Sequence, residues 1–220
     1  MIDIKISDKL KEKCPQLAIG CIEATVVVED GSEELWTIIN KYCDEIQEKY
    51  NQEDVLKIKN IDNSRKAYKA LGKDPSRYRL SSESLVKRIV KGNGLYKVNN
   101  VVDINNLISL KSCYSVGTYD LDKIVSTIEF TVGKEGESYE GIGRGPINLE
   151  NLPVFKDEEG YFGSSTSDST RAMITESTKH ILMNIISFNG DEELKEYMDE
   201  AVNLLEAYAD GKVLDRKIVK

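Results

Sequence analysis

V-N-N-V-V-D-I-N-N-L-I-S-L (Val98–Leu110) and S-V-G-T-Y-D-L-D-K-I (Ser115–Ile124) are the two blocks on which the fold prediction depends. The first block predicts a helix after Asp103, which is expected to cap it, because an Asp side chain accepts hydrogen bonds from free N–H groups of a first helical turn. In the second block, Asp120 predicts a turn. We therefore expect the polar residues of this stretch to be mainly structural: Asn99, Asn100, Asp103, Asn106, Asp120 and Asp122.

The flanking sequence mixes helix and strand patterns. Towards the N-terminus it predicts a strand in Leu17–Val28, a helix near Glu33–Tyr50 capped by Ser32, a helix near Ser64–Leu71 and a helix capped by Ser81 or Ser82. Towards the C-terminus it predicts strands in Lys123–Val132 and Glu137–Ile142, a hairpin of Leu152–Phe155 with Tyr161–Phe162, a helix near Thr175–Phe188 and an amphipathic helix from Asp191 to about Ala209. Without regular βαβ alternation, this order predicts an α+β (mixed α/β) fold in one domain, residues 1–220.

Composition narrows the class of protein. Hydrophobic residues make up 40% and charged residues 31% of the 220 residues, as in soluble globular proteins. No apolar run approaches the roughly 18–20 residues of a membrane helix, and the N-terminus lacks the apolar centre of a signal peptide. We expect a cytoplasmic protein without a membrane partner.

Cysteine and histidine are sparse. The four cysteines are widely spaced and form no C-x-x-C pair, so we interpret them as small core residues. His180 is the only histidine, which argues against a Ser-His-Asp triad or a His-rich metal site. No metal or cofactor is expected.

The net charge of −8 hides a strong asymmetry. Residues 55–100 carry twelve basic side chains against three acidic ones, which gives this window +9 and the remainder −17. Such a window can form a phosphate-binding face. The alternative is a pair of helices whose lysines simply face solvent.

The two opening blocks resemble the core signature of the B3/B4 domain of the phenylalanyl-tRNA synthetase beta subunit, close to I-N-N-V-V-D-V-T-N-Y-V-M followed by P-L-H-A-F-D-L-D-K-I, with the same spacing between blocks. A third block in the same order is S-T-R-A-M-I-T-E-S-T-K-H-I-L-M (Ser169–Met183), and the resemblance extends over roughly residues 60–190. The run R-x-x-Y-K-x-L-G-x-D-P-S-R-Y-R (Arg65–Arg79) also looks like free-standing proteins built from this domain.

The resemblance implies two halves that meet at a cleft, where the synthetase deacylates tRNA carrying tyrosine instead of phenylalanine. The family's catalytic His and Glu fall at Gly117 and Asn184, which cannot act as general bases. The aminoacylation module is absent, so the chain is not expected to be a complete aminoacyl-tRNA ligase.

The polar loop before the third block offers other catalytic candidates: Asp168, Ser169, Thr170 and Arg171. Asp168 could orient water or hold an α-ammonium group, the two hydroxyls could donate hydrogen bonds, and Arg171 could offer two parallel donors to a carboxylate or phosphate. The alternative is a polar loop with a local Asp168–Arg171 salt bridge.

The candidates for binding substrate or RNA combine the basic segment with the resemblance: Arg65, Tyr68, Arg77, Arg79, Asn106, Gly117, Tyr119 and Asn184. Arginine with interleaved tyrosine suits phosphate contact and base stacking, and the alternative is an Arg–carboxylate network. Three hypotheses follow: an editing hydrolase that deacylates mischarged aminoacyl-tRNA in trans, a non-catalytic tRNA- or RNA-binding module, and a small-molecule pocket protein that has lost RNA binding.

Overall fold

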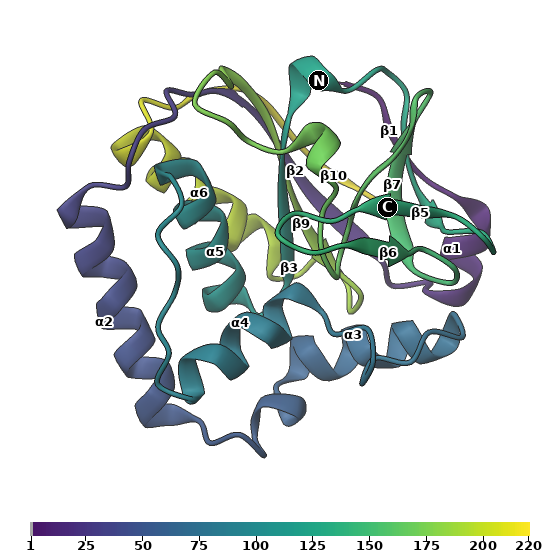
Figure 1. The fold of residues 1–220 in the computed structure, drawn as a ribbon, viewed down its shortest axis with the longest axis horizontal. Helices are drawn as coiled ribbons and strands as arrows, with labels where there is room; N and C mark the ends of the chain where they lie inside the picture. Colours follow the sequence, from purple (N-terminus) through teal and green to yellow (C-terminus); the bar gives the residue numbers. More distant parts are fainter. Residues whose placement is uncertain (1) are drawn as a thin grey trace.

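A four-stranded antiparallel sheet, here the central sheet, divides the molecule in a computed structural model that describes residues 2–220 (Figure 1). Its strands lie in the order β10 (Lys212–Val219), β2 (Ala18–Thr25), β9 (His180–Ser187) and β3 (Ser115–Asp120). Its two inner strands, β2 and β9, come from opposite ends of the chain.

A second sheet, the outer sheet, packs on one face of the central sheet. Its order is β1 (Ile4–Ile6), β4 (Ile128–Val132), β7 (Pro153–Asp157) and β8 (Gly160–Ser164), with β1 parallel to β4 and the other pairs antiparallel. A separate two-stranded hairpin follows β4 in the chain: β5 (Ser138–Glu140) and β6 (Pro146–Asn148).

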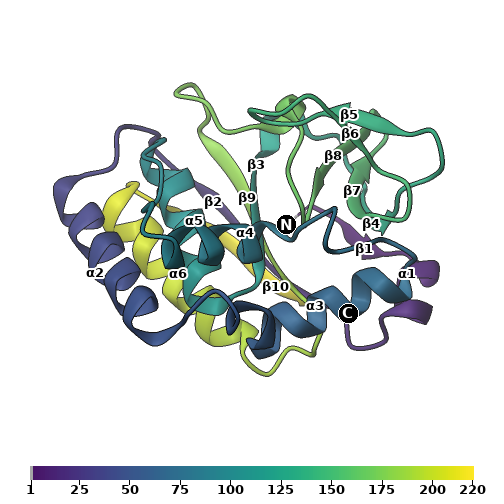
Figure 2. The ribbon, with the colours of Figure 1, turned by 60° about the horizontal axis from the view of Figure 1, so that its bottom comes forward.

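Helices cover the other face of the central sheet (Figure 2). The helical elements are α1 (Asp8–Lys13), α2 (Glu33–Lys49), α3 (Lys59–Ala70), α4 (Ser81–Val90), α5 (Asn100–Ser112) and α6 (Leu194–Tyr208), with the short 3₁₀ turns η1 (Val55–Lys57), η2 (Leu121–Lys123) and η3 (Thr170–Ala172). No helix within residues 2–220 is both long and apolar enough to cross a membrane.

Strand alternation sorts the buried residues into two cores. On β9, Ile181, Met183 and Ile185 belong to the core under the helices, whereas Leu182 and Ile186 belong to the core between the sheets. Successive strand side chains point to opposite faces, so the intervening Asn184 faces the outer sheet. Large buried side chains, among them Phe130, Phe155 and Phe162, fill the space between the sheets.

The α+β prediction is confirmed, and several elements lie where they were expected. The strand in Leu17–Val28, the helix capped by Ser32, the turn at Asp120, the β7–β8 hairpin and the helix after Asp191 are all present. The Ser32 side chain accepts a hydrogen bond from the N–H of Leu35 at 3.2 Å.

The helix predicted near Thr175–Phe188 is wrong, because β9 occupies most of that range. Both faces of β9 are covered, so its sequence lacks the alternation that marks a half-exposed strand, and a short continuous apolar run does not distinguish strand from helix. β1, α1, β3, β6 and β10 were not predicted.

Several predicted boundaries and caps are also corrected. α5 begins at Asn100 with Asn99 as its cap, while the Asp103 carboxylate accepts from the Trp36 indole at 2.8 Å and from Val98 N at 3.1 Å. α3 begins five residues before the predicted Ser64, at Lys59. The cap position of α4 is Leu80 rather than a serine, and β4 begins at Ile128.

Candidate functional site

Three tyrosine hydroxyls hold the segment after β8, residues 164–169, here called the serine loop. Tyr68 on α3 contacts Ser165 Oγ at 2.7 Å and Thr166 Oγ1 at 2.9 Å. Tyr139 on β5 donates to the carbonyl of Ser167 at 2.6 Å. Tyr119 on β3 donates to Asp168. Three segments that are distant in the chain therefore fix the shape of this loop.

Asp168 is the strongest acid–base candidate in the serine loop. Its Oδ1 accepts from the Tyr119 hydroxyl at 2.8 Å and from Ser164 N at 3.0 Å. Burial raises the pKa of this carboxyl to about 6, although both hydrogen bonds act in the opposite direction. Asp168 as a residue is partly exposed, but its carboxyl group lies at a buried position, and Oδ2 accepts no hydrogen bond from residues 2–220. A carboxylate with a pKa near neutrality and one unused oxygen is suited to accept a proton.

The three residues after Asp168 differ in what they can do. Ser169 is buried, and its Oγ accepts from Arg171 N at 3.1 Å. Thr170 is exposed. Arg171 pairs with Asp157, with its Nη2 2.8 Å from Oδ1 and its Nη1 3.1 Å from Oδ2, so its two parallel donors are already engaged. The alternative of an Asp168–Arg171 salt bridge is therefore wrong.

Gly117 and Asn184 lie directly opposite each other across the β3–β9 pair. The positions that the resemblance assigns to the catalytic His and Glu are thus neighbours in space, although 67 residues separate them in the chain. Asn184 is completely buried, and neither its Nδ2 nor its Oδ1 has a hydrogen-bond partner among residues 2–220. Such a buried amide costs on the order of 1–3 kcal/mol per unpaired group.

Tyr119 and Asn106 lie on opposite sides of the central sheet. The Tyr119 side chain points between the sheets, and burial raises its pKa well above the usual value, so the phenol stays protonated and donates to Asp168. Asn106 lies on α5, on the helical side, where its Oδ1 accepts from Asn105 at 3.3 Å. The structure therefore does not bring Asn106 to the serine loop.

The basic segment contains two kinds of arginine. Arg65 donates to the fully buried Glu83 at 2.7 Å and to the carbonyl of Pro75 at 3.0 Å, which corresponds to the predicted alternative of an Arg–carboxylate network. Arg77 and Arg79 are exposed and form no ion pair with residues 2–220. Tyr68 is fully buried, which corrects the expectation that it stacks on a base.

Backbone contacts bring the basic segment against the serine loop. Ser81 N donates to the carbonyl of Ser165 at 2.9 Å. On the other side, the buried Lys73 donates to the carbonyl of Asn148 at 3.1 Å and to that of Glu150 at 2.5 Å, beside the β5–β6 hairpin. The same hairpin reaches Asp168, whose carbonyl accepts from Ile142 N at 2.9 Å. The basic segment, the β5–β6 hairpin and the serine loop therefore belong to one region.

Sequence reasoning did not identify Tyr139, Ser164 or Gly163 as parts of this site. Tyr139 lies 28 residues before the carbonyl that it binds, and Ser164 contributes a backbone N–H that carries no residue-specific signal. Only the predicted short strand in Glu137–Ile142 gave any indication that the hairpin would be ordered.

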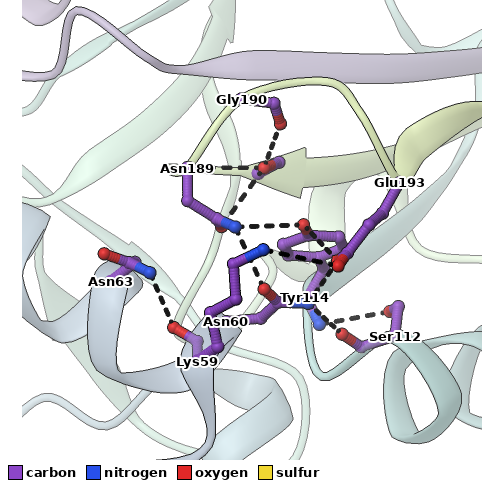
Figure 3. A network of polar contacts seen from close by, with 9 residues as sticks. Lys59, Asn60, Asn63, Ser112, Tyr114, Asn189, Gly190 and Glu193 are labelled. Carbon is purple, nitrogen blue, oxygen red and sulfur yellow. Dashed lines mark hydrogen bonds and ion pairs between the residues drawn. The ribbon is translucent and has the colours of Figure 1, made fainter.

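A second polar cluster joins α3 to the residue before β3 and to the loop between β9 and α6 (Figure 3). Asn60 donates to Glu193 at 3.1 Å, Tyr114 donates to the same carboxylate oxygen at 3.0 Å, and Asn189 donates to Asn60 at 3.1 Å. Hydrogen bonds, chiefly that from Asn60, lower the pKa of Glu193. These side chains satisfy one another, so we interpret the cluster as a clamp between elements.

A surface pocket of about 770 Å³ lies away from the serine loop. Its lining includes three acidic side chains, Glu29, Asp30 and Glu176. Negative charge of this density disfavours a phosphate ligand. Residues 2–220 contain no group of three or more His, Cys, Asp or Glu side chains that could hold a metal ion.

A family model and a curated relative agree with the resemblance seen in the sequence. A model of the B3/4 domain family matches residues 63–210. The phenylalanine–tRNA ligase beta subunit of Fusobacterium nucleatum is 25% identical in an alignment 167 residues long, which covers 63% of this chain and 21% of that protein. The crystal structure of an N-terminal fragment of the phenylalanyl-tRNA synthetase beta subunit from Pyrococcus horikoshii aligns with 99% of this chain and 50% of its own, with 14% identity and a TM-score of 0.48.

The chain thus spans 21% of the curated relative and half of the solved fragment. The family match contains the serine loop, the central β3–β9 pair and both exposed arginines, and it covers well over half of the chain. The chain belongs to the B3/4 domain family and is a module related to tRNA synthetases.

Proposed function

We propose that this chain binds aminoacylated tRNA and hydrolyses the ester of a wrongly attached amino acid. The observation that carries this proposal is Asp168, whose buried carboxyl has a pKa of about 6 and one unused oxygen, in a loop fixed by three tyrosines. The similarity to phenylalanine–tRNA ligase beta subunits supports the choice of substrate. Because translation uses charged tRNA in the cytoplasm, we propose that the protein acts there.

The proposed chemistry needs a base and little else, since an aminoacyl ester is already activated. Asp168 accepts a proton from a water molecule while the water oxygen bonds to the ester carbonyl carbon. The exposed hydroxyl of Thr170 is available to donate to the oxygen that becomes negative. The bond from carbon to the ribose oxygen then breaks, and the ribose takes the proton back from Asp168.

This scheme accounts for the loss of the family's His and Glu positions. Gly117 has no side chain, and Asn184 has no acid–base function and is enclosed between the sheets. Asp168 reaches the same region from the outer sheet, because its carboxylate binds the tyrosine two residues after Gly117. The base would therefore have moved from the central sheet to the serine loop.

A panel of correctly and incorrectly charged tRNAs tests the proposal. The protein is incubated with each tRNA, and ester loss is compared for wild type, Asp168→Asn and the exposed neighbour variant Glu158→Gln. Loss of a general base is expected to slow hydrolysis by about 10²–10⁴-fold, whereas Glu158→Gln should match wild type. Equal rates for wild type and Asp168→Asn would remove Asp168 from the mechanism.

The second candidate is a module that holds tRNA without chemistry, and the exposed, unpaired Arg77 and Arg79 favour it. It predicts binding that weakens with salt and no ester loss for any charged tRNA. Replacing both arginines by alanine should lower the slope of log affinity against log salt by about two, one for each phosphate contact. The matched control removes two exposed lysines of α2, Lys41 and Lys49, and should leave the slope unchanged.

The third hypothesis, a small-molecule pocket protein, gains no specific support from the serine loop. It predicts no tRNA affinity even at low salt. The same binding measurement decides between it and the other two.

A further inference from the structure

The Tyr119 side chain occupies the space between the two sheets next to Asp168. It is only 1% exposed, and its ring packs edge-on against Phe162, with centroids 4.9 Å apart, and against Phe155, with centroids 5.8 Å apart. Its hydroxyl reaches Asp168 Oδ1. The phenol therefore borders the carboxylate on the side that faces the interior of the protein.

Two glycines make room for the phenol. A Cβ atom at Gly117 would lie 2.3 Å from the Tyr119 hydroxyl oxygen, and one at Gly163 would lie 2.2 Å from it. Both distances are far shorter than a van der Waals contact, and the obstructing group is held by aromatic packing and a hydrogen bond. The tyrosine therefore fills a space that depends on the absence of side chains on β3 and β8.

Asn184 lies beside this space. Directly opposed residues of an antiparallel pair have Cβ positions about 4.5–5.5 Å apart, so the amide starts next to the position above Gly117 that the phenol occupies. Both of its polar atoms are buried and unpartnered. The layer between the sheets thus contains an unused hydrogen-bonding group next to a site occupied by the chain's own side chain.

We infer that Tyr119 fills the pocket that would otherwise take the amino-acid side chain of the substrate, and that it restricts the enzyme to esters of small amino acids such as glycine, alanine and serine. This inference rests on the proposed hydrolysis with Asp168 as base, since the reacting ester must then lie beside that carboxylate. A large acyl side chain could enter the space between the sheets only by displacing the ring.

The shape of the space gives a second consequence. Replacing Tyr119 by alanine leaves a hole that matches a p-hydroxyphenyl group, with Asp168 available to the hydroxyl and the Asn184 amide beside it. The variant should therefore bind p-cresol, while wild type should not. Phenylalanine at the same position keeps the hole filled and is the matched control.

The first experiment needs no mutation. Wild type is compared on alanyl-, seryl-, phenylalanyl- and tyrosyl-tRNA, and kcat/KM should be at least about tenfold higher for the two small amino acids, since steric exclusion from a filled pocket commonly exceeds this factor. Equal or faster hydrolysis of the aromatic esters would overturn the inference while leaving the proposed function intact. No hydrolysis of any ester would overturn the proposed function and the substrate restriction together.

The second experiment tests the pocket itself. Tyr119→Ala should gain at least about tenfold in kcat/KM on tyrosyl-tRNA, and calorimetry should detect p-cresol binding to this variant, as cavities made by large-to-small substitutions bind matching small molecules. Tyr119→Phe should show neither gain. If Tyr119→Ala does not fold, Tyr119→Leu replaces it in both assays. A folded variant that binds no p-cresol and keeps the wild-type preference would contradict the assignment.

Discussion

The two faces of the central sheet are built from the same strands but have different chemistry. Towards the helices, β9 presents Ile181, Met183 and Ile185 to an apolar core. Towards the outer sheet, the alternate position Asn184 carries an unpartnered amide, and Tyr119 brings a hydroxyl to Asp168. The helical side of β9 is therefore apolar from Ile181 to Ile185. The other has polar groups where apolar side chains would pack better, which is typical of a functional site.

The largest expected loss of stability comes from placing an amide on the helical face of β9, as Asn184 does on the opposite face. Ile185→Asn removes a fully buried apolar side chain and inserts an amide among apolar neighbours, so the free energy of unfolding should fall by about 4 kcal/mol. Urea unfolding measures the loss. Ile185→Val, which only shortens the side chain, should cost about 1 kcal/mol. A similar small loss for both variants would contradict the proposed difference between the faces.

The pH dependence of stability should report Asp168. Its folded pKa of about 6 lies above the ordinary carboxyl value of 3.8, so protonation favours the folded state. This contribution is fully present below about pH 4 and is lost as the pH rises through 6, with a difference of up to about 3 kcal/mol. Asp168→Asn cannot titrate, so its stability relative to wild type should increase across this window.

Unfolding of both proteins at several pH values between 4 and 7.5 measures that difference. Glu158→Gln, which changes an exposed carboxyl, should show no such trend relative to wild type. A gap between Asp168→Asn and wild type that does not vary with pH would show that Asp168 has an ordinary pKa.

Asn184→Val tests the opposite exchange on the other face. Valine suits a strand and removes two unpaired polar atoms, so the variant should be more stable than wild type by about 1–2 kcal/mol. Thermal and urea unfolding give the measurement. A loss of stability would instead show that the amide is satisfied in solution by water held between the sheets.

The smallest effect is expected for Tyr119→Phe, which keeps the packing and removes one hydroxyl. The hydrogen bond from Tyr119 lowers the pKa of Asp168, so the pKa of this carboxyl should rise further in the variant. A carboxyl carbon NMR titration follows it, and stability should fall by about 1 kcal/mol. Tyr139→Phe removes a hydroxyl from a carbonyl of the same loop and should leave the Asp168 titration nearly unchanged.

Local chemistry made part of this molecule predictable. Ser32 as a helix cap and the stripe of apolar residues after it identify α2 from the sequence. Asp120 as a turn former is equally local, because its carboxylate binds a backbone N–H two residues away. The exposed Arg77 and Arg79 also follow from their position in a turn with Asp-Pro-Ser.

The remainder depends on contacts that no local pattern carries. β9 was predicted as a helix because layers on both of its sides remove the alternation of a strand. For Arg65 the sequence left phosphate contact and a carboxylate network both open, because its partner Glu83 lies on the next helix, 18 residues away. The loop with Asp168 was recognised by its composition, but its link to Tyr119 spans 49 residues and needed the structure.

The position of β2 has a consequence for how the molecule folds. This strand, at residues 18–25, pairs with residues 180–187 on one edge and with residues 212–219 on the other. Both pairings close loops of more than 150 residues, whose entropic cost must be met before any hydrogen bond of the ladder forms. During synthesis, the early strand therefore waits without a partner until residue 187 has left the ribosome, and its second edge stays open until residue 219 follows. The helices α2 to α5 can form earlier from contacts near in sequence. Folding of the central sheet should therefore be slow and should come after formation of the helices.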